Sequence, residues 1–202
     1  MSRNTYVLRS NPGELTFIDK FLDALDLINE KYGMEFEYAL FEEGASDLAR
    51  HVYLETQERA ILSLCEDFAV PARYLMVEAA TQQEVDHLGE WLKNLLPFIP
   101  LEELQQEARE KINDDPQVLV RMALGTYQLA DPISLEILRE GLRSDNVLVR
   151  FRAAAATSFT EWIDFLPDLI PITENDPSPE VREMAIKAVE ACQRRVQAKE
   201  TS

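Results

Sequence analysis

Apolar residues recur at helical spacing along much of this chain, most clearly between Glu14 and Tyr32. The apolar positions of that segment lie on one face of a helix that would follow a turn at Asn11-Pro12-Gly13 and end at Gly33. They are Phe17, Ile18, Phe21, Leu25, Ile28 and Tyr32. Similar patterns predict helices over about 47–67, 70–80 and 82–96, and we interpret 34–47 as a turn-rich connection, although Met34–Tyr38 alternates as a short strand would.

Four carboxylates lie opposite this apolar face. Asp19, Asp23, Asp26 and Glu30 follow one another at spacings of four, three and four residues, which places them in one row along the helix. Like charges at these spacings repel and weaken the helix slightly. The row is either an ordinary solvated face or a contact surface for basic side chains, and the sequence leaves both open.

A phrase that begins with Asp and ends with Val-Arg or a close variant occurs three times in the second half of the chain. The copies are Asp115–Arg121, Asp145–Arg150 and Asp176–Arg182, and their arginines are 29 and 32 residues apart. Each copy precedes an alanine-containing segment with helical spacing. A period of this length is typical of stacked helical repeats, which more often hold a partner than perform chemistry.

These phrases resemble the HEAT-like repeat family, in the short form present in phycobilin lyases and many bacterial proteins. The resemblance implies an all-α fold, in which antiparallel helix pairs stack as an α-α superhelix. It implies first helices over about 101–113, 132–143 and 161–174, and second helices over about 116–129, 146–159 and 179–195. Upstream, Asp67–Arg73 has the spacing of a degenerate copy. We therefore divide the chain into an acidic helical region (1–54), a possible degenerate repeat (55–100) and regular repeats (101–198).

The repeated Asp and Arg residues have an expected structural role. An Asp at a helix start can accept hydrogen bonds from the free N–H groups of the first turn. We expect each Arg to pair with an Asp of its own turn or the next one, although a row of ligand-binding cations is the alternative. The six positions are Asp115, Arg121, Asp145, Arg150, Asp176 and Arg182.

The composition is strongly acidic, with a formal net charge of −17 over 202 residues. Residues 1–110 contain 22 Asp and Glu against 9 Lys and Arg, whereas residues 111–202 contain 15 against 11. Such a field disfavours nucleic acid and anionic membranes and speeds encounter with a basic partner, although acidity also keeps proteins in solution. We find no apolar segment of membrane-spanning length and no secretory signal, and we expect a cytoplasmic protein with two buried thiols, Cys65 and Cys192.

The sequence offers few candidates for catalysis. His51 and Glu55 would lie one helical turn apart, and Glu84-Val85-Asp86-His87 has the Glu-x-x-His spacing of half a di-iron site, but the second half is absent. The chain contains no Walker phosphate loop, no Gly-x-Gly-x-x-Gly and no Gly-x-Ser-x-Gly. We therefore predict no catalytic, cofactor-binding or metal-binding residues.

The function that fits these observations is a non-catalytic module that binds another protein with a basic surface, as a monomer or in a simple hetero-complex. An inhibitor, an immunity protein or an assembly factor would each meet this description. The row Asp19, Asp23, Asp26 and Glu30 is the best local candidate for the contact. The family resemblance implies an alternative, a factor for chromophore attachment similar to phycobilin lyases, and the sequence does not decide between the two.

Overall fold

The chain forms two compact units, Met1–Ile99 and Pro100–Ser202, in a computed structural model that describes residues 1–43, 48–126 and 130–200. The expected junction between residues 54 and 55 falls at the end of a strand, whereas the boundary between the units lies next to the expected start of the repeats at residue 101.

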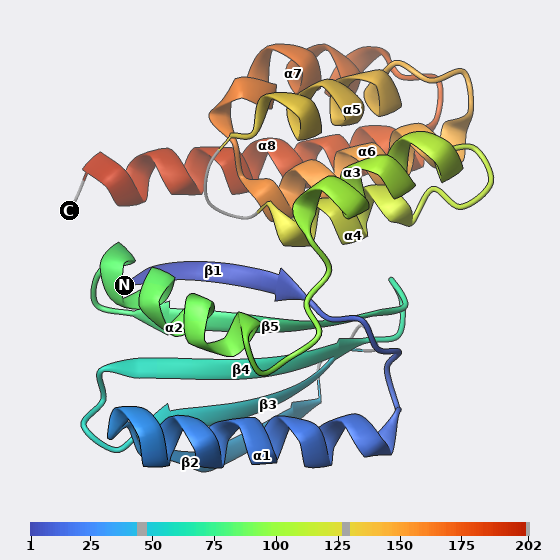
Figure 1. Ribbon diagram of the computed structural model, residues 1–202. Coiled ribbons are helices and arrows are strands. Elements are labelled where there is room, and N and C mark those ends of the chain that lie inside the picture. Colours follow the sequence, from blue (N-terminus) through green and yellow to red (C-terminus); the bar gives the residue numbers. More distant parts are fainter. Residues whose placement is uncertain (44–47, 127–129, 201–202) are drawn as a thin grey trace. The chain divides into compact units, whose positions relative to one another are not determined.

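Unit 1 is built on a five-stranded sheet in which every pairing is antiparallel. Its elements are β1 (Ser2–Val7), α1 (Leu15–Tyr32), β2 (Phe36–Glu43), β3 (Leu48–Glu55), β4 (Ala60–Asp67), β5 (Ala72–Ala79) and α2 (Gln82–Lys93). The strand order is β1-β5-β4-β3-β2, so that the first two strands in the sequence form the two edges (Figure 1).

The expected all-α fold and α-α superhelix are therefore wrong, because the chain is mixed, with 21% of its residues in strands and 55% in helices. The segments 47–67 and 70–80, expected to be helical, contain β3, β4 and β5 from residue 48 onward, and residue 47 lies outside the described residues. Likewise, the supposed turn-rich connection over 34–47 contains β2, and its last four residues are also undescribed. The Asp67–Arg73 phrase is the turn between β4 and β5 rather than a repeat.

The physical reason is that strand formation depends on packing more than on composition. β4 and β5 are rich in Ala, Leu, Met and Glu, which favour helices in isolation. The turn between β3 and β4 also contains no Gly or Asn, and Glu58 adopts the left-handed conformation there, with φ of 59°. Because Gly and Asn, which typically mark turns, are absent here, the sequence does not indicate a turn between β3 and β4. The segment 47–67 therefore resembles one long helix.

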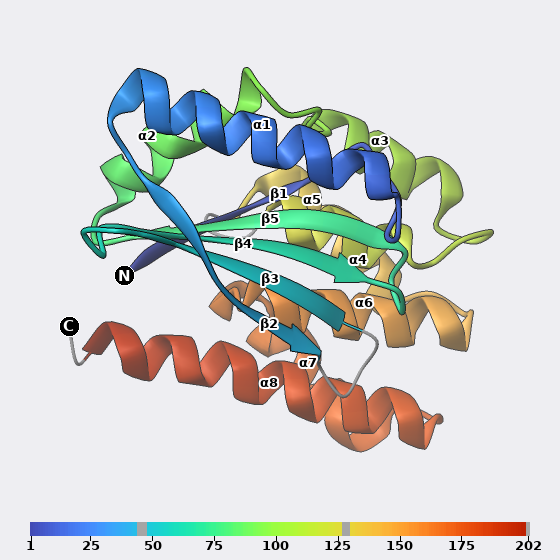
Figure 2. The ribbon, with the colours of Figure 1, turned by 90° about the horizontal axis from the view of Figure 1, so that it is seen from below.

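The core of unit 1 lies between α1, α2 and one face of the sheet (Figures 1 and 2). On that face Leu62 is opposite Val77 and Leu64 is opposite Leu75, and all four side chains are buried. From α1, the ring of Phe21 meets Tyr53 of β3 edge to face, with their centroids 5.2 Å apart. Each buried side chain of this size contributes about 1.5–3 kcal/mol.

The chain after α2 returns to β1 and completes the unit. The N–H of Arg9 donates to the Pro97 carbonyl at 2.7 Å, and the N–H of Ile99 donates to the Val7 carbonyl at 2.9 Å. Leu8 and Phe98 form a β-bridge between these segments. This pairing explains why the boundary of the unit falls after Ile99 and not at the end of α2.

All secondary-structure elements in the described part of unit 2 are helices. They are α3 (Leu101–Lys111), α4 (Val118–Gly125), α5 (Pro132–Leu142), α6 (Val147–Thr160), a 3₁₀ turn η1 (Ile163–Phe165), α7 (Leu166–Asn175) and α8 (Pro179–Glu200). Consecutive helices pack as α3 with α4, α5 with α6 and α7 with α8, while α4, α6 and α8 also pack side by side. These helices lie where the repeated phrases place them, and the end of the helix expected over 116–129 lies outside the described residues.

Small residues let helices of unit 2 approach closely. A Cβ added to Gly141 of α5 would lie 2.9 Å from the Cβ of Ala153 in α6 and 3.2 Å from Leu119 Cδ1 in α4. Ala153 is itself fully buried. The α5–α6 contact therefore leaves no room for a larger side chain at either position.

Candidate functional site

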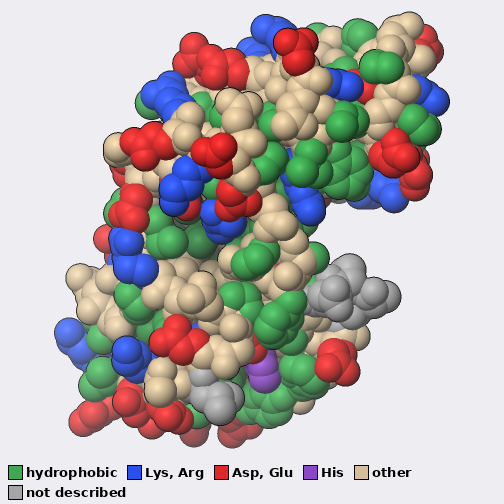
Figure 3. All heavy atoms as spheres, turned by 90° about the vertical axis from the view of Figure 1, so that its right-hand side faces the viewer, with side chains coloured by type: hydrophobic (Ala, Val, Ile, Leu, Met, Phe, Trp, Pro, Cys, Tyr) green, Lys and Arg blue, Asp and Glu red, His purple; other side chains and the backbone are tan. Residues whose placement is uncertain are grey.

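The acidic row predicted from the sequence is exposed along α1. Asp19, Asp23, Asp26 and Glu30 are all exposed, and the apolar face opposite them is in the core. Red carboxylate side chains gather at the lower margin of the view in Figure 3, the side on which α1 lies in Figure 1. The structure thus brings the four predicted residues together on one surface.

Two leucines that the sequence analysis did not single out border this row. Leu22 is 41% exposed and Leu27 is 49% exposed, and helical geometry places them on opposite sides of the row. We call the surface formed by Asp19, Leu22, Asp23, Asp26, Leu27 and Glu30 the α1 outer face. Its mixture of carboxylates and exposed apolar side chains differs from a purely solvated face.

The two units of the structure differ less in net charge than the two parts of the chain before and after residue 110. Unit 1 contains 18 Asp and Glu against 8 Lys and Arg, and unit 2 contains 19 against 12. The α1 outer face is therefore a local concentration of charge and not the consequence of one unit being acidic and the other balanced.

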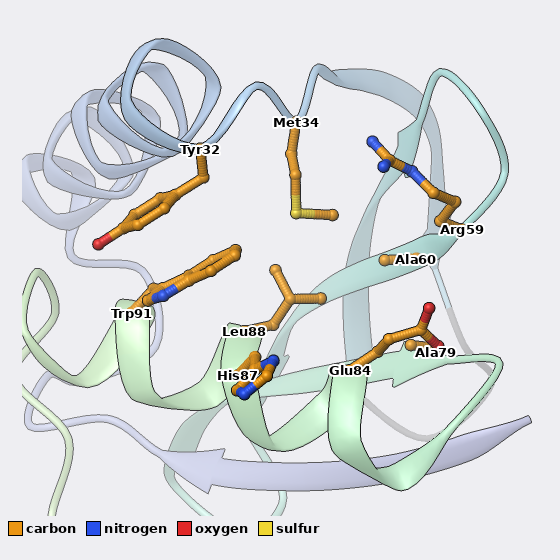
Figure 4. Close-up of a pocket in the computed structure, with 9 residues that line it drawn as sticks. All are labelled: Tyr32, Met34, Arg59, Ala60, Ala79, Glu84, His87, Leu88 and Trp91. Atoms are coloured by element: carbon orange, nitrogen blue, oxygen red, sulfur yellow. The ribbon is translucent and has the colours of Figure 1, made fainter.

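A pocket of about 200 Å³ lies at the other end of α1, entirely within unit 1 (Figure 4). Three parts of the unit form it: the end of α1 with the residue pair that follows, the β3–β4 turn with the adjacent strand ends, and α2. The lining residues are Tyr32, Met34, Arg59, Ala60, Ala79, Glu84, His87, Leu88 and Trp91.

Aromatic rings form one end of this pocket. The rings of Tyr32 and Trp91 stack, with centroids 3.8 Å apart and planes 5° from parallel. The ring of His87 lies nearly parallel to Trp91 at a centroid distance of 6.4 Å. Met34 and Leu88 extend into the space beside them (Figure 4). This end of the pocket offers a rigid apolar surface.

Arg59 lies at the opposite end, and a buried carboxylate fixes its position. Its Nη2 donates to Glu55 Oε1 at 2.6 Å, and Glu55 Oε2 also accepts from the backbone N–H groups of Gln57 and Arg59. The hydrogen bond from Arg59 is the main reason that the pKa of Glu55 is lowered, against the opposing effect of burial. The same bond raises the pKa of Arg59, so this guanidinium remains charged and oriented.

Glu84 lies across from Arg59, at the start of α2 (Figure 4). It belongs to a capping box, in which Oε2 accepts from the Thr81 N–H at 2.9 Å and from Thr81 Oγ1 at 2.8 Å. The Thr81 side chain in turn accepts from the Glu84 N–H. One carboxylate oxygen is thus engaged in the helix cap, while no donor among the described residues hydrogen-bonds to the other.

Neither histidine motif belongs to a cluster of three or more potential metal ligands among the described residues. Glu84 and His87 do share the pocket, but the described residues contain no group of three or more His, Cys, Asp or Glu side chains suited to a metal ion. His51 and Glu55 lie in strand β3 and not one helical turn apart.

Both cysteines are buried and reduced. Burial raises the pKa of Cys65 to about 12 and that of Cys192 to about 11. Thiolates are therefore scarce at neutral pH, which argues against a nucleophilic role for either residue. Cys65 lies in strand β4, whereas the sequence analysis places it in a helix over 47–67.

The repeated arginines connect turns of unit 2. Arg121 pairs with Asp115 of its own turn at 3.0 Å and with Glu107 of α3 at 3.2 Å. Arg182 donates through Nη1 to the Asp176 carbonyl at 2.6 Å. These contacts are internal to the helical unit, so the arginines do not form a row free for a ligand.

Arg150 makes the most extensive of these contacts. Its Nε and Nη2 donate to the two oxygens of Asp176 at 2.7 and 3.2 Å, and Nη1 donates to the Ser144 carbonyl at 2.8 Å. Asp145, in contrast, is exposed, and the residue that caps α6 is its neighbour Asn146, whose Oδ1 accepts from the Leu148 N–H. The expected capping role of Asp145 is therefore wrong.

Sequence reasoning missed the pocket as a unit, because its lining comes from three separate segments without a common spacing. Among the lining residues, the sequence analysis singles out Glu84 and His87 for their Glu-x-x-His spacing, but not Arg59. Arg59 could have been found only by recognising the β3–β4 turn that orients it.

None of the described helices combines the length and the apolar character needed to cross a membrane. Comparison with family models, with curated proteins and with solved structures finds no match to this chain.

Proposed function

We propose that this protein is a non-catalytic binding module whose α1 outer face recognises a basic surface of another protein. The observation that carries the proposal is the combination of an aligned acidic row with an exposed leucine on each side. Basic side chains of a partner would pair with the carboxylates, and its apolar side chains would cover Leu22 and Leu27.

The energetics of α1 support this proposal. Three neighbouring pairs along the row have like charges at i, i+3 or i, i+4 spacing, and each costs about 0.2–0.5 kcal/mol. Glu30 also lies in the last turn, where the helix dipole disfavours negative charge. Alternating charges would solvate this face equally well without the repulsion. A basic partner would relieve it, because each cation brought to the row reduces the repulsion between its neighbours.

The experiment compares the parent protein with two variants of equal net charge. The α1 variant replaces Asp19, Asp23, Asp26 and Glu30 by Lys. The control variant replaces four exposed carboxylates of unit 2 by Lys, namely Glu102, Glu140, Glu174 and Glu190. Proteins captured from the native cell by the parent and by the control, but not by the α1 variant, are the partners that the proposal predicts.

Association rates with such a partner should fall steeply with salt for the parent and the control, since exposed charges steer encounter and are screened beyond about 8 Å at physiological ionic strength. Replacing Leu22 and Leu27 by Ser should mainly increase the dissociation rate and leave the salt dependence unchanged. The proposal fails if the α1 variant retains the same proteins with the same rates as the parent.

A further inference from the structure

The pocket of unit 1 combines features that the proposed contact on the α1 outer face does not use. It has an apolar end made by Trp91, Met34 and Leu88, and a charged end where Arg59 and Glu84 approach from opposite sides (Figure 4). These two residues come from different segments, the β3–β4 turn and the start of α2. A positive and a negative group at one end of the pocket, with apolar side chains at the other, provide a pair of recognition elements.

Each of these charged groups is held by its own neighbour and not by the other. Arg59 binds Glu55 through Nη2, while its Nε and Nη1 donate to no acceptor in the described part of the chain. Glu84 binds Thr81 through Oε2, while its Oε1 accepts no hydrogen bond from the residues that the structure describes. No ion pair within 4.0 Å joins Arg59 to Glu84 among the described residues. Both groups are therefore oriented in advance and each keeps hydrogen-bonding capacity for a ligand, which reduces the entropy lost on binding.

The size of the pocket limits what it can hold. An enclosed volume of about 150 Å³ holds one benzene ring. The pocket, at about 200 Å³, has room for a molecule somewhat larger than that and smaller than a nucleotide or most cofactors. A ligand of this size must place a positive and a negative group close together at one end and an apolar group at the other.

The geometry points to a free α-amino acid with an apolar side chain as the ligand of this pocket. Its carboxylate would bind Arg59, its ammonium group would bind Glu84, and its side chain would lie against Met34, Leu88 and Trp91. This inference does not depend on the proposed partner of the α1 outer face, because none of the residues of that face lines the pocket.

The test uses L-leucine with two analogues that each lack one charge. Leucinamide has no carboxylate, and 4-methylpentanoic acid has no ammonium group. The readout is the indole N–H resonance of Trp91 in the pocket, and the only other tryptophan, Trp162 in unit 2, is the internal reference. Leucine should shift the Trp91 signal in a saturable manner and leave Trp162 unchanged, and each analogue should bind at least about tenfold more weakly, since a charge-assisted hydrogen bond is lost.

Two variants assign the charges. Arg59→Gln should bind leucine and leucinamide equally, and Glu84→Gln should bind leucine and 4-methylpentanoic acid equally. Glutamine retains the capping box at position 84, so the second variant removes the charge without removing the helix cap. Glu90→Gln, on the exposed side of α2, is the matched control and should bind leucine as the parent does.

Two results would overturn the inference. One is the absence of any Trp91 shift in the parent with leucine up to about 50 mM, a concentration far above the millimolar affinity expected of so small a ligand. The other is equal binding of leucine and leucinamide by the parent, which would show that Arg59 does not recognise a carboxylate. Amide spectra that superimpose for parent and variants ensure that a lost response is not caused by unfolding.

Discussion

Arg73 lies directly opposite Glu66 in the β4–β5 ladder, and their side chains form an ion pair inside unit 1. Arg73 is only 1% exposed. Its Nη1 donates to Ser10 Oγ at 2.9 Å and its Nη2 donates to the Glu14 carbonyl at 3.2 Å, while Glu66 Oε1 accepts from the Gly13 N–H at 2.8 Å. One buried pair thus fixes the turn between β1 and α1 to the adjacent ends of β4 and β5.

Removing one member of this pair should destabilise unit 1. We expect Glu66→Gln to lower the free energy of unfolding by about 3–5 kcal/mol, because it leaves the buried guanidinium without a counter-charge. Denaturant unfolding followed by Trp91 fluorescence in a Trp162→Phe background measures this in unit 1. The control is Lys93→Gln, which breaks an exposed pair with Glu90 and should cost less than about 1 kcal/mol. Equal effects of the two substitutions would contradict the role assigned to Glu66.

The Arg150–Asp176 pair should contribute a measurable coupling energy in unit 2. Arg150 and Asp176 side chains are 12% and 5% exposed, and their contact is bidentate. A double-mutant cycle with Arg150→Gln and Asp176→Asn should give a coupling of about 1–3 kcal/mol, measured by unfolding followed through Trp162 in a Trp91→Phe background. Arg143→Gln, which removes a largely exposed contact with Asp168, should change stability much less. A cycle that closes with no coupling would show that the pair does not stabilise the helix stack.

The same pair predicts a pH dependence. The hydrogen bond from Arg150 lowers the pKa of Asp176, so this carboxylate stays charged in the folded state to a lower pH than in the unfolded chain. Its contribution to stability is therefore fully present above the unfolded pKa, about 3.9, and is lost as the pH falls through the folded value. Asp176→Asn should cost most near neutral pH and progressively less in acid. A difference between parent and variant that stays constant over this range would oppose the assignment.

The close contact between α5 and α6 makes a further prediction about stability. Ala153→Leu should destabilise unit 2 by about 1–3 kcal/mol, because the added atoms meet Gly141 and its neighbours in a contact that already has no free space. Ala130→Leu, at an exposed position between helices, is the control and should have little effect. An unchanged thermal midpoint for Ala153→Leu would place this residue elsewhere than in the helix contact.

Gly89 provides a comparable case in unit 1. A Cβ at this position would lie 2.0 Å from the hydroxyl oxygen of Tyr6 and 2.7 Å from its Cζ. Gly89→Ala should therefore destabilise the protein, although alanine favours a helix over glycine by about 1 kcal/mol. Tyr6→Phe in the same chain should restore part of the loss by removing the nearest atom. Thermal unfolding of the two variants tests this, and a Gly89→Ala protein more stable than the parent would show that the backbone tolerates the side chain.

The sequence predicts the helices of this protein better than its fold. α1, α2 and the helices of unit 2 have long apolar faces with clear starts and ends, and such patterns can be read from one sequence. β4 and β5 could not be read this way, because their residues favour helices and their strand conformation depends on pairing with distant segments. The turn at Glu58 has a backbone conformation that its residue type does not indicate.

The two candidate sites also differ in how far they can be predicted from the sequence. The acidic row is local, since its four residues lie on one helix and their alignment follows from spacing alone. The pocket depends on the turn that carries Arg59 approaching α2, and nothing in the spacing of Arg59 and Glu84 indicates that they meet. The sequence predicts that Arg150 pairs with an Asp of its own turn or the next one, and its partner is Asp176 of the next turn. It does not predict that Asn146, and not Asp145, caps α6.

The position of β1 at the edge of the sheet has a consequence for the order of folding. Ser2 pairs with Ala79 and Val7 pairs with Tyr74, so β1 pairs with the strand of its sheet that is synthesised last. At about 5–20 residues per second, several seconds pass before β5 leaves the ribosome, and during that time the hydrogen-bonding groups of β1 have no partner strand. Unit 1 then closes through contacts that are distant in the sequence, whereas unit 2 can form from neighbouring helices as each one emerges. We therefore expect nascent chains that end before β5 to be the form of this protein most easily cleaved by proteases.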